Sequence, residues 1–380
     1  MDKRTIRPKF FFQSGGILLI LLISSLFSII LAIISQAKSL SDSIVFESET
    51  PLLSQNKNFE TSNSIKLFNL KNLPENFLED KFEKNKTLKP FLAVSVDNYI
   101  NVQPQAGLQS ADIVFETLVE GGTTRILAFF KNDPYEVVPV RSTRDYFLDL
   151  TKIFNGYQVG AGGSLTALKR AKEQKLPYLN SLESAEFFKR VRFFRSVSDK
   201  TRSPESHDGL IKPSFLRSIL TERFGFLTPE NPIKFQNEKI NPKEFRSEKS
   251  TEYDITIKFS SISSYDVRYE YVPYLNSYKR LLANSVQTDD LTAKPILVKN
   301  VVVLGATITP RNDADGHLDI DLQSGGTAYF FMDGKMVVGK WKSGMKFFDN
   351  KGNEVILNHG NTWISILKES DILKVKYNLI

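Results

Sequence analysis

Hydrophobic residues gather first in one long run near the N-terminus, from about Ile17 to Ile34. A helix rises about 1.5 Å per residue, so this run approaches the thickness of a bilayer's hydrocarbon core, and Phe10 to Phe12 lengthen it to a full span. Basic residues precede the run, which favours a cytoplasmic N-terminus. We therefore predict that residues 1–37 form a cytoplasmic stub and an uncleaved transmembrane signal anchor.

A cleavable signal peptide is the alternative for this segment, because Ser35-Gln36-Ala37 resembles a small-x-small cleavage site. Both interpretations export the rest of the chain. The expected location is the cell membrane, with a single pass and with the C-terminal domains outside the cytoplasm. Residues 38–88 are rich in Ser, Asn, Lys and Glu, and they predict a flexible polar spacer.

Short apolar runs separated by turn residues follow over residues 89–235, and they predict buried strands mixed with amphipathic helices. Strands are expected at 91–96, 112–119, 125–130, 137–140, 157–161 and 191–194, and helices at 145–154, 164–174, 184–190 and 214–224. Ser164 is the predicted N-cap of the second helix. Strands and helices mixed at this spacing indicate a layered α/β domain.

The pattern changes after a polar stretch at 228–250, which we take as the joint between two lobes. Residues 250–380 carry β-branched and aromatic runs typical of strands, with Asp333-Gly334 as a hairpin turn. Those strands are expected at 253–259, 265–271, 299–306, 327–332, 335–341 and 362–367. The predicted class is therefore mixed α/β: a layered α/β sandwich lobe followed by a β-rich lobe.

The composition excludes several kinds of functional site. The chain has no cysteine, which excludes disulfides, Cys-bound zinc, a thiol nucleophile and lipid attachment through an N-terminal Cys. The net charge is +7, and removing the −1 and +4 of the first nine residues leaves +4. A modestly basic exported domain suits an anionic envelope polymer or lipid head groups and gives no indication of nucleic acid.

Three arginines at predicted strand ends are the strongest candidates for binding. Arg125, Arg141 and Arg144 stand near a glycine turn, Gly162-Gly163-Ser164, whose backbone amides open a helix. Guanidinium groups beside a helix N-terminus suit a phosphate or carboxylate. The predicted anion site therefore consists of these arginines and the turn. The acids that would orient the arginines, or simply pair with them, are Asp97, Asp112, Glu116 and Glu120.

No catalytic template is complete. The glycine turn lacks the Lys-Ser/Thr of a phosphate-binding loop, and Thr166 stands where a nucleophile elbow needs glycine. Ser164 is therefore a cap rather than a nucleophile. The acids around His317 do not follow the calcium-loop spacing, and His207 lies in a predicted loop. We assign no metal site, no cofactor and no catalytic residue.

Several blocks match a known family. They are Ser95-Val96-Asp97-Asn98, Pro104 to Leu108, Ala111 to Glu116, Glu120 to Arg125, Pro139 to Ser142 with Arg144, Gly162 to Ser164, Asn300 to Val303, Gly334, Gly339 to Trp341 and Gly360 to Ile364. On these residues the chain resembles the YerB family of bacterial envelope proteins, whose domain has no known function (DUF3048). The resemblance implies an α/β domain joined to a β-rich one on the outer face of the membrane. Members are often lipoproteins, whereas this chain would substitute a transmembrane anchor.

Three functions remain open. The first is a binding or assembly-accessory role, in which the arginines hold an anionic envelope ligand. The second is a metal-dependent phosphotransferase or hydrolase acting on a lipid-linked pyrophosphate, since Thr124-Arg125 and Arg144-Asp145 are similar in layout to envelope phosphotransferases of the LytR-CpsA-Psr type. The third is a structural scaffold in which carboxylates pair with the arginines.

Overall fold

The computed structural model describes residues 89–182, 213–237 and 253–379. The predicted anchor (1–37), the spacer (38–88), the helix at 184–190 and the strand at 191–194 lie outside these residues, as does most of the predicted joint. Within the described ranges, no helix combines the length and the apolar character needed to cross a membrane.

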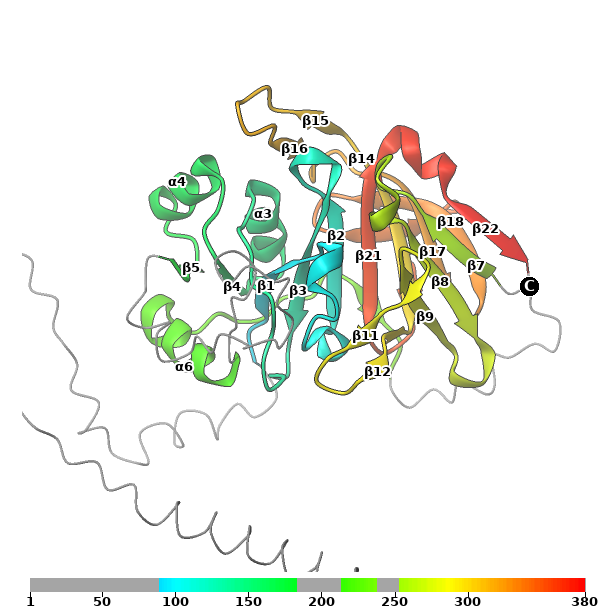
Figure 1. Cartoon of the computed structure of the whole chain (residues 1–380), viewed down its shortest axis with the longest axis horizontal. Helices are drawn as coiled ribbons and strands as arrows, with labels where there is room; N and C mark the ends of the chain where they lie inside the picture. Colours follow the sequence, from blue (N-terminus) through cyan, green and yellow to red (C-terminus); the bar gives the residue numbers. More distant parts are fainter. Residues whose placement is uncertain (1–88, 183–212, 238–252, 380) are drawn as a thin grey trace, which may run out of the picture. The chain divides into compact units, whose positions relative to one another are not determined.

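Strands from both halves of the chain form one ten-stranded sheet (Figure 1). Its order is β19 (Lys346–Asp349), β18 (Lys335–Lys342), β17 (Gly326–Met332), β14 (Asn300–Ala306), β21 (Thr362–Lys368), β2 (Ile113–Leu118), β3 (Thr124–Phe130), β1 (Leu92–Asp97), β4 (Tyr157–Gly160) and β5 (Tyr178–Asn180). The halves join where β2 pairs in parallel with β21, from Ile113 beside Thr362 to Thr117 beside Ile366. The two predicted lobes, 89–235 and 250–380, therefore share this sheet rather than having one each.

A second, smaller sheet comes from the C-terminal half alone. It contains β10 (Ser285–Val286), β9 (Ser277–Leu282), β8 (Val267–Val272), β7 (Tyr253–Ile257) and β22 (Lys376–Leu379), with β13 (Leu297–Val298) beside β9. Its inner residues, such as Ile255 and Val267, share one core cluster with Val94 and Ile126 of the large sheet. The two sheets therefore form a sandwich.

The helices α3 (Asp145–Ile153), α4 (Leu165–Glu173) and α6 (Pro213–Phe224) complete the fold. Phe147 and Leu150 of α3 pack with Ala93 and Phe129, on the face of the large sheet opposite the smaller one. Successive strand residues thus enter opposite cores, which explains why the central strands are unbroken apolar runs. The mixed α/β class is confirmed.

Short elements connect these layers. The two-stranded pairs are β11 (Thr288–Asp289) with β12 (Lys294–Pro295), β15 (Ile308–Pro310) with β16 (Leu318–Ile320) and β20 (Ile356–Leu357) with β6 (Lys234–Phe235). Short 3₁₀ helices occur at Ile100–Val102, Leu108–Ser110, Glu120–Gly122, Ser263–Tyr265, Pro273–Leu275 and Glu369–Lys374.

One predicted strand is absent as such. Residues 137–140 form only isolated bridges, Val138 with Ala106 and Val140 with Val96. Pro139 lies between them and has no N–H to donate, so a regular ladder cannot continue there. The predicted cap and hairpin are confirmed: the Ala167 amide donates to Ser164 Oγ at 3.2 Å, and Asp333 and Gly334 both have positive φ between β17 and β18.

Candidate functional site

Most of the predicted site residues meet at one edge of the large sheet. β1 and β2 both run antiparallel to β3, and β4 and β5 run parallel to β1, so the carboxyl ends of these four strands coincide. That edge is where open α/β sheets usually bind ligands. Asp112 is an exception, because it precedes β2 and lies about 20 Å away at the opposite end of that strand. Its Oδ2 accepts a bond from the Lys131 amide at 2.7 Å.

Arg144 is paired with Glu120. Its Nε donates to Glu120 Oε2 at 3.0 Å, its Nη2 donates to Oε1, and its Nη1 donates to the Thr143 carbonyl at 2.7 Å. A two-pronged bond of this kind is among the stronger ion pairs in proteins. Burial raises the pKa of Glu120, but the hydrogen bond and charge of Arg144 outweigh it and hold that pKa below its ordinary value. Arg144 therefore already has a full carboxylate partner.

The other two arginines are also engaged. Arg141 Nε lies 3.0 Å from Asp97 Oδ2, with the arginine side chain 29% exposed. Arg125 is buried; its Nη1 donates to the Ser142 carbonyl at 3.2 Å, and its Nη2 lies 3.8 Å from Glu120 Oε1. Burial, reinforced by repulsion from Arg144, lowers the pKa of Arg125 to about 10. Ion pairing of all three arginines with acids is what the scaffold alternative expects.

Glu116 pairs with a residue from the other half of the chain rather than with the predicted arginines. Its Oε2 accepts from Arg280 Nη2 at 2.8 Å, and both side chains are at most 1% exposed. Asn98 Nδ2 and Thr124 Oγ1 donate to Oε1 at 2.8 and 3.0 Å, and the Arg280 guanidinium lies 4.2 Å from the Trp363 ring centre. Burial raises the pKa of Glu116, and the charge of Arg280 opposes that rise. No sequence motif marks Arg280.

The glycine turn uses its own amides internally. The Gly162 amide donates to Asn180 Oδ1 at 2.8 Å, and the Ser164 amide donates to the Thr143 carbonyl at 3.3 Å. Gly162 has φ of +73°, a conformation that glycine adopts without strain. Ser164 Oγ, besides capping α4, donates to Asp145 Oδ2 at 3.3 Å. The turn therefore connects β4 to α4, and at least two of its amides already form hydrogen bonds within the protein.

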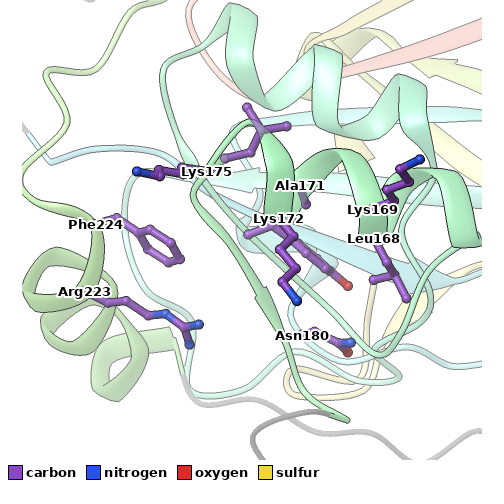
Figure 2. A pocket seen from close by; sticks show the side chains of 10 residues that line it. Leu168, Lys169, Ala171, Lys172, Lys175, Asn180, Arg223 and Phe224 are labelled. Carbon is purple, nitrogen blue, oxygen red and sulfur yellow. The ribbon is translucent and has the colours of Figure 1, made fainter. Parts of the chain in front are cut away.

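A cleft between α4 and α6 lies next to this turn, and Figure 2 shows it. We call it the α4–α6 cleft. It has a volume of about 520 Å³ and is lined by Leu168, Lys169, Ala171, Lys172, Lys175, Leu176, Tyr178, Asn180, Arg223 and Phe224. Asn180, whose side chain accepts the Gly162 amide, connects the cleft to the predicted site.

Within the part of the chain that the structure describes, most cations of the α4–α6 cleft lack an acidic partner. Lys172, Lys175 and Arg223 are exposed, and within the described ranges none of them forms an ion pair. Lys169 lies 3.8 Å from Glu173, and both of those side chains are more than half exposed. Lys172 and Arg223 reach into the space from the two helices (Figure 2). The basic face of α4 is visible in the sequence, but its position opposite α6 is not.

Metal-binding groups do not converge in the described ranges, which contain no cluster of three or more Asp, Glu or His side chains able to hold an ion. His317 Nδ1 lies 2.7 Å from Asp313 Oδ2 within the β15–β16 hairpin. His207 lies outside the described residues.

Comparison with known proteins identifies the family. Models of the N-terminal and C-terminal domains of DUF3048, a protein of unknown function, match residues 79–221 and 255–364. The chain belongs to the DUF3048 family. YerB of Bacillus subtilis (strain 168), whose name describes it as a lipoprotein, is 30% identical over 300 residues, which are 78% of this chain and 86% of YerB. The crystal structure of the YerB protein from Bacillus subtilis matches with a TM-score of 0.64 and 27% identity, covering 77% of this chain and 94% of that one.

The domain boundaries of the family show that one of the ion pairs joins two domains. Glu116 belongs to the N-terminal DUF3048 domain and Arg280 to the C-terminal one, so their buried contact joins the two domains. The three candidate arginines and the glycine turn all belong to the N-terminal domain. The name of YerB is consistent with a membrane-associated envelope protein, and DUF3048 itself carries no known activity.

Proposed function

We propose that this DUF3048 protein is an exported, membrane-anchored envelope protein that binds an anionic envelope ligand in the α4–α6 cleft. The observation that carries the proposal is the set of three cations, Lys172, Lys175 and Arg223, which line one cleft of about 520 Å³ without ion-pair partners in the described chain. Neighbouring like charges repel, so a bound anion would relieve that repulsion and accept charge-assisted hydrogen bonds. The apolar run at 17–34 would supply the anchor.

In this proposal Arg125, Arg141 and Arg144 have a supporting role. Their contacts with Glu120, Asp97 and the Ser142 carbonyl fix the edge of the sheet from which the glycine turn and α4 begin. An anion held directly by these arginines would have to compete with carboxylates already in place. Within the described ranges, no acid forms an ion pair with Lys172, Lys175 or Arg223.

Helix ends offer another explanation for the cleft cations. Lys172 lies near the C-terminus of α4 and Arg223 near that of α6, where positive charge complements the helix dipole by about 0.3–1 kcal/mol. That explanation predicts a loss of stability when the cations are removed, with no effect on ligands. Binding and thermal unfolding measured on the same variants separate the two roles.

The test uses the full-length chain purified in detergent and a fluorescent polyphosphate, followed by anisotropy at physiological salt. The variant Lys172→Ala/Lys175→Ala/Arg223→Ala should bind at least about tenfold more weakly, because each charge-assisted contact contributes about 1 kcal/mol or more. The control Lys335→Ala/Lys340→Ala/Lys346→Ala removes the same charge from exposed residues of β18 and β19, at the other end of the sheet, and should bind nearly as wild type.

Equal binding by the two triple variants would contradict the proposal and leave only general electrostatic attraction. Loss of binding in Arg141→Ala or Arg144→Ala, with the cleft variant unaffected, would move the ligand to the arginines. Release of phosphate that requires a divalent metal would favour the phosphotransferase or hydrolase alternative.

A further inference from the structure

We infer that the ligand of the α4–α6 cleft is a linear polymer of phosphodiester units with carbon-containing spacers, and not a single phosphate group; this inference rests on the proposed function. The first argument is size. A cleft of about 520 Å³ falls in the range that encloses a drug-sized molecule, so an isolated phosphate would fill a small part of it. The ligand therefore extends over several chemical groups.

The second argument is the arrangement of charge. Lys169 and Lys172 are three residues apart on α4, a spacing of about 4.5 Å along the helix axis, and Lys175 follows two residues after the helix ends. Arg223 of α6 lines the cleft from the opposite side. Cations distributed along a line and across from it suit a chain with repeated negative charges. A compact dianion would contact only part of this set.

The third argument is the apolar surface between the charges. Leu168, Ala171, Leu176 and Phe224 line the same cleft, as does Tyr178, which is largely buried. A ligand composed of phosphate alone would leave this surface in contact with water. Glycerol or sugar units between phosphates would cover it, and burial of apolar surface is favourable in proportion to its area. The lining therefore favours a polymer with carbon-containing spacers over inorganic polyphosphate.

The experiment compares four probes with the full-length chain by titration calorimetry: inorganic phosphate, inorganic polyphosphate, poly(glycerol phosphate) matched to the polyphosphate in charge, and vesicles of phosphatidylglycerol. Affinity per molecule should rise steeply from phosphate to the polymers, and poly(glycerol phosphate) should bind more tightly than polyphosphate. Its affinity should also fall with salt, with a log–log slope of about −2 to −3, and K172A should make that slope shallower by nearly 1.

The variant Leu168→Ala separates the spacer from the charge; Leu168 is preferred to Phe224 because the Arg223 guanidinium lies 5.3 Å from the Phe224 ring centre, so removing that ring would also disturb a cation. Leu168→Ala should weaken poly(glycerol phosphate) about three- to tenfold and leave polyphosphate nearly unchanged, because loss of part of one apolar contact is worth about 1 kcal/mol. Failure to bind any probe would overturn the proposed function as well. Binding of polymers with no preference for poly(glycerol phosphate), or binding of phosphate as tightly as the polymers, would overturn this inference alone. Vesicle binding that depends on Lys172 in place of polymer binding would assign the cleft to lipid head groups and overturn the polymer.

Discussion

The arginine cluster at the sheet edge and the α4–α6 cleft are both basic, yet they differ in how their charges are satisfied. Arg144 and Arg141 each contact a carboxylate at about 3 Å, whereas Lys172 and Arg223 have no ion-pair partner within the described ranges. In the arginine cluster, the protein's own carboxylates already pair with the positive charges. The α4–α6 cleft leaves charge available to a ligand. Density of charged residues in a sequence therefore indicates a structural junction as readily as a binding site.

The buried pair Glu116–Arg280 should give the largest effect and defines the structural end of this comparison. Removing one partner leaves the other charge buried and unpaired, so Arg280→Met should lower the free energy of unfolding by about 3–5 kcal/mol, measured by urea denaturation. The double variant Glu116→Gln/Arg280→Met removes both charges and should be less destabilised than Arg280→Met alone. A cost below about 1 kcal/mol for the single change would show that the pair does not hold the domains together.

Arg144 tests the middle of the range. Arg144→Ala removes the bonds to Glu120 and to the Thr143 carbonyl, and it should cost about 1–3 kcal/mol of stability in the same denaturation experiment. Polyphosphate binding measured on the folded variant should be unchanged, since the cleft cations are intact. The reverse outcome, normal stability with binding lost, would restore the arginines as the anion site.

The smallest effect is the pH dependence of the Glu120 pair. The folded-state pKa of Glu120 is lowered, so its contribution to stability is present above the ordinary value of 4.5 and is lost as pH falls through the lower folded-state value. Because the carboxylate is partly exposed, we expect about 1 kcal/mol or less. The unfolding midpoint of wild type should therefore fall more than that of Glu120→Gln between pH 5 and pH 3, about the range where carboxyl groups titrate. Equal falls would mean that the pair contributes nothing measurable.

The sequence alone predicts the local structure of this protein well. Residues 91–96 have the apolar pattern of a strand buried on both sides, because both faces of β1 are covered. The helix cap at Ser164 and the turn at Asp333-Gly334 depend on only a few neighbouring residues. These features depend on short-range sterics and hydrogen bonding, which a sequence displays directly. Pro139 shows the limit, since an apolar run with a proline at its centre forms bridges and no ladder.

The long-range pairings could not be predicted in this way. Nothing in the residues around Arg280 indicates that Glu116, from the other domain, is its partner. The sequence pattern does not indicate β9 either, because Lys279 and Arg280 interrupt its apolar residues. The α4–α6 cleft could not be predicted either, because it also depends on residues that are distant in the sequence. Lys172 and Arg223 are far apart in the sequence and come together only through the packing of α4 and α6 around β5.

The parallel contact between β2 and β21 has a consequence for how the chain matures. The Thr117 hydroxyl donates a hydrogen bond to the carbonyl of Ile366, a residue 249 positions later. Until β21 near the end of the chain is in place, β2 has an open edge with unpaired N–H and C=O groups. Contacts of such long separation form slowly, and an open edge recruits whatever strand arrives first. We expect the first domain to depend on chaperones until β21 is in place, and concentrated copies of the chain to exchange β21 with one another.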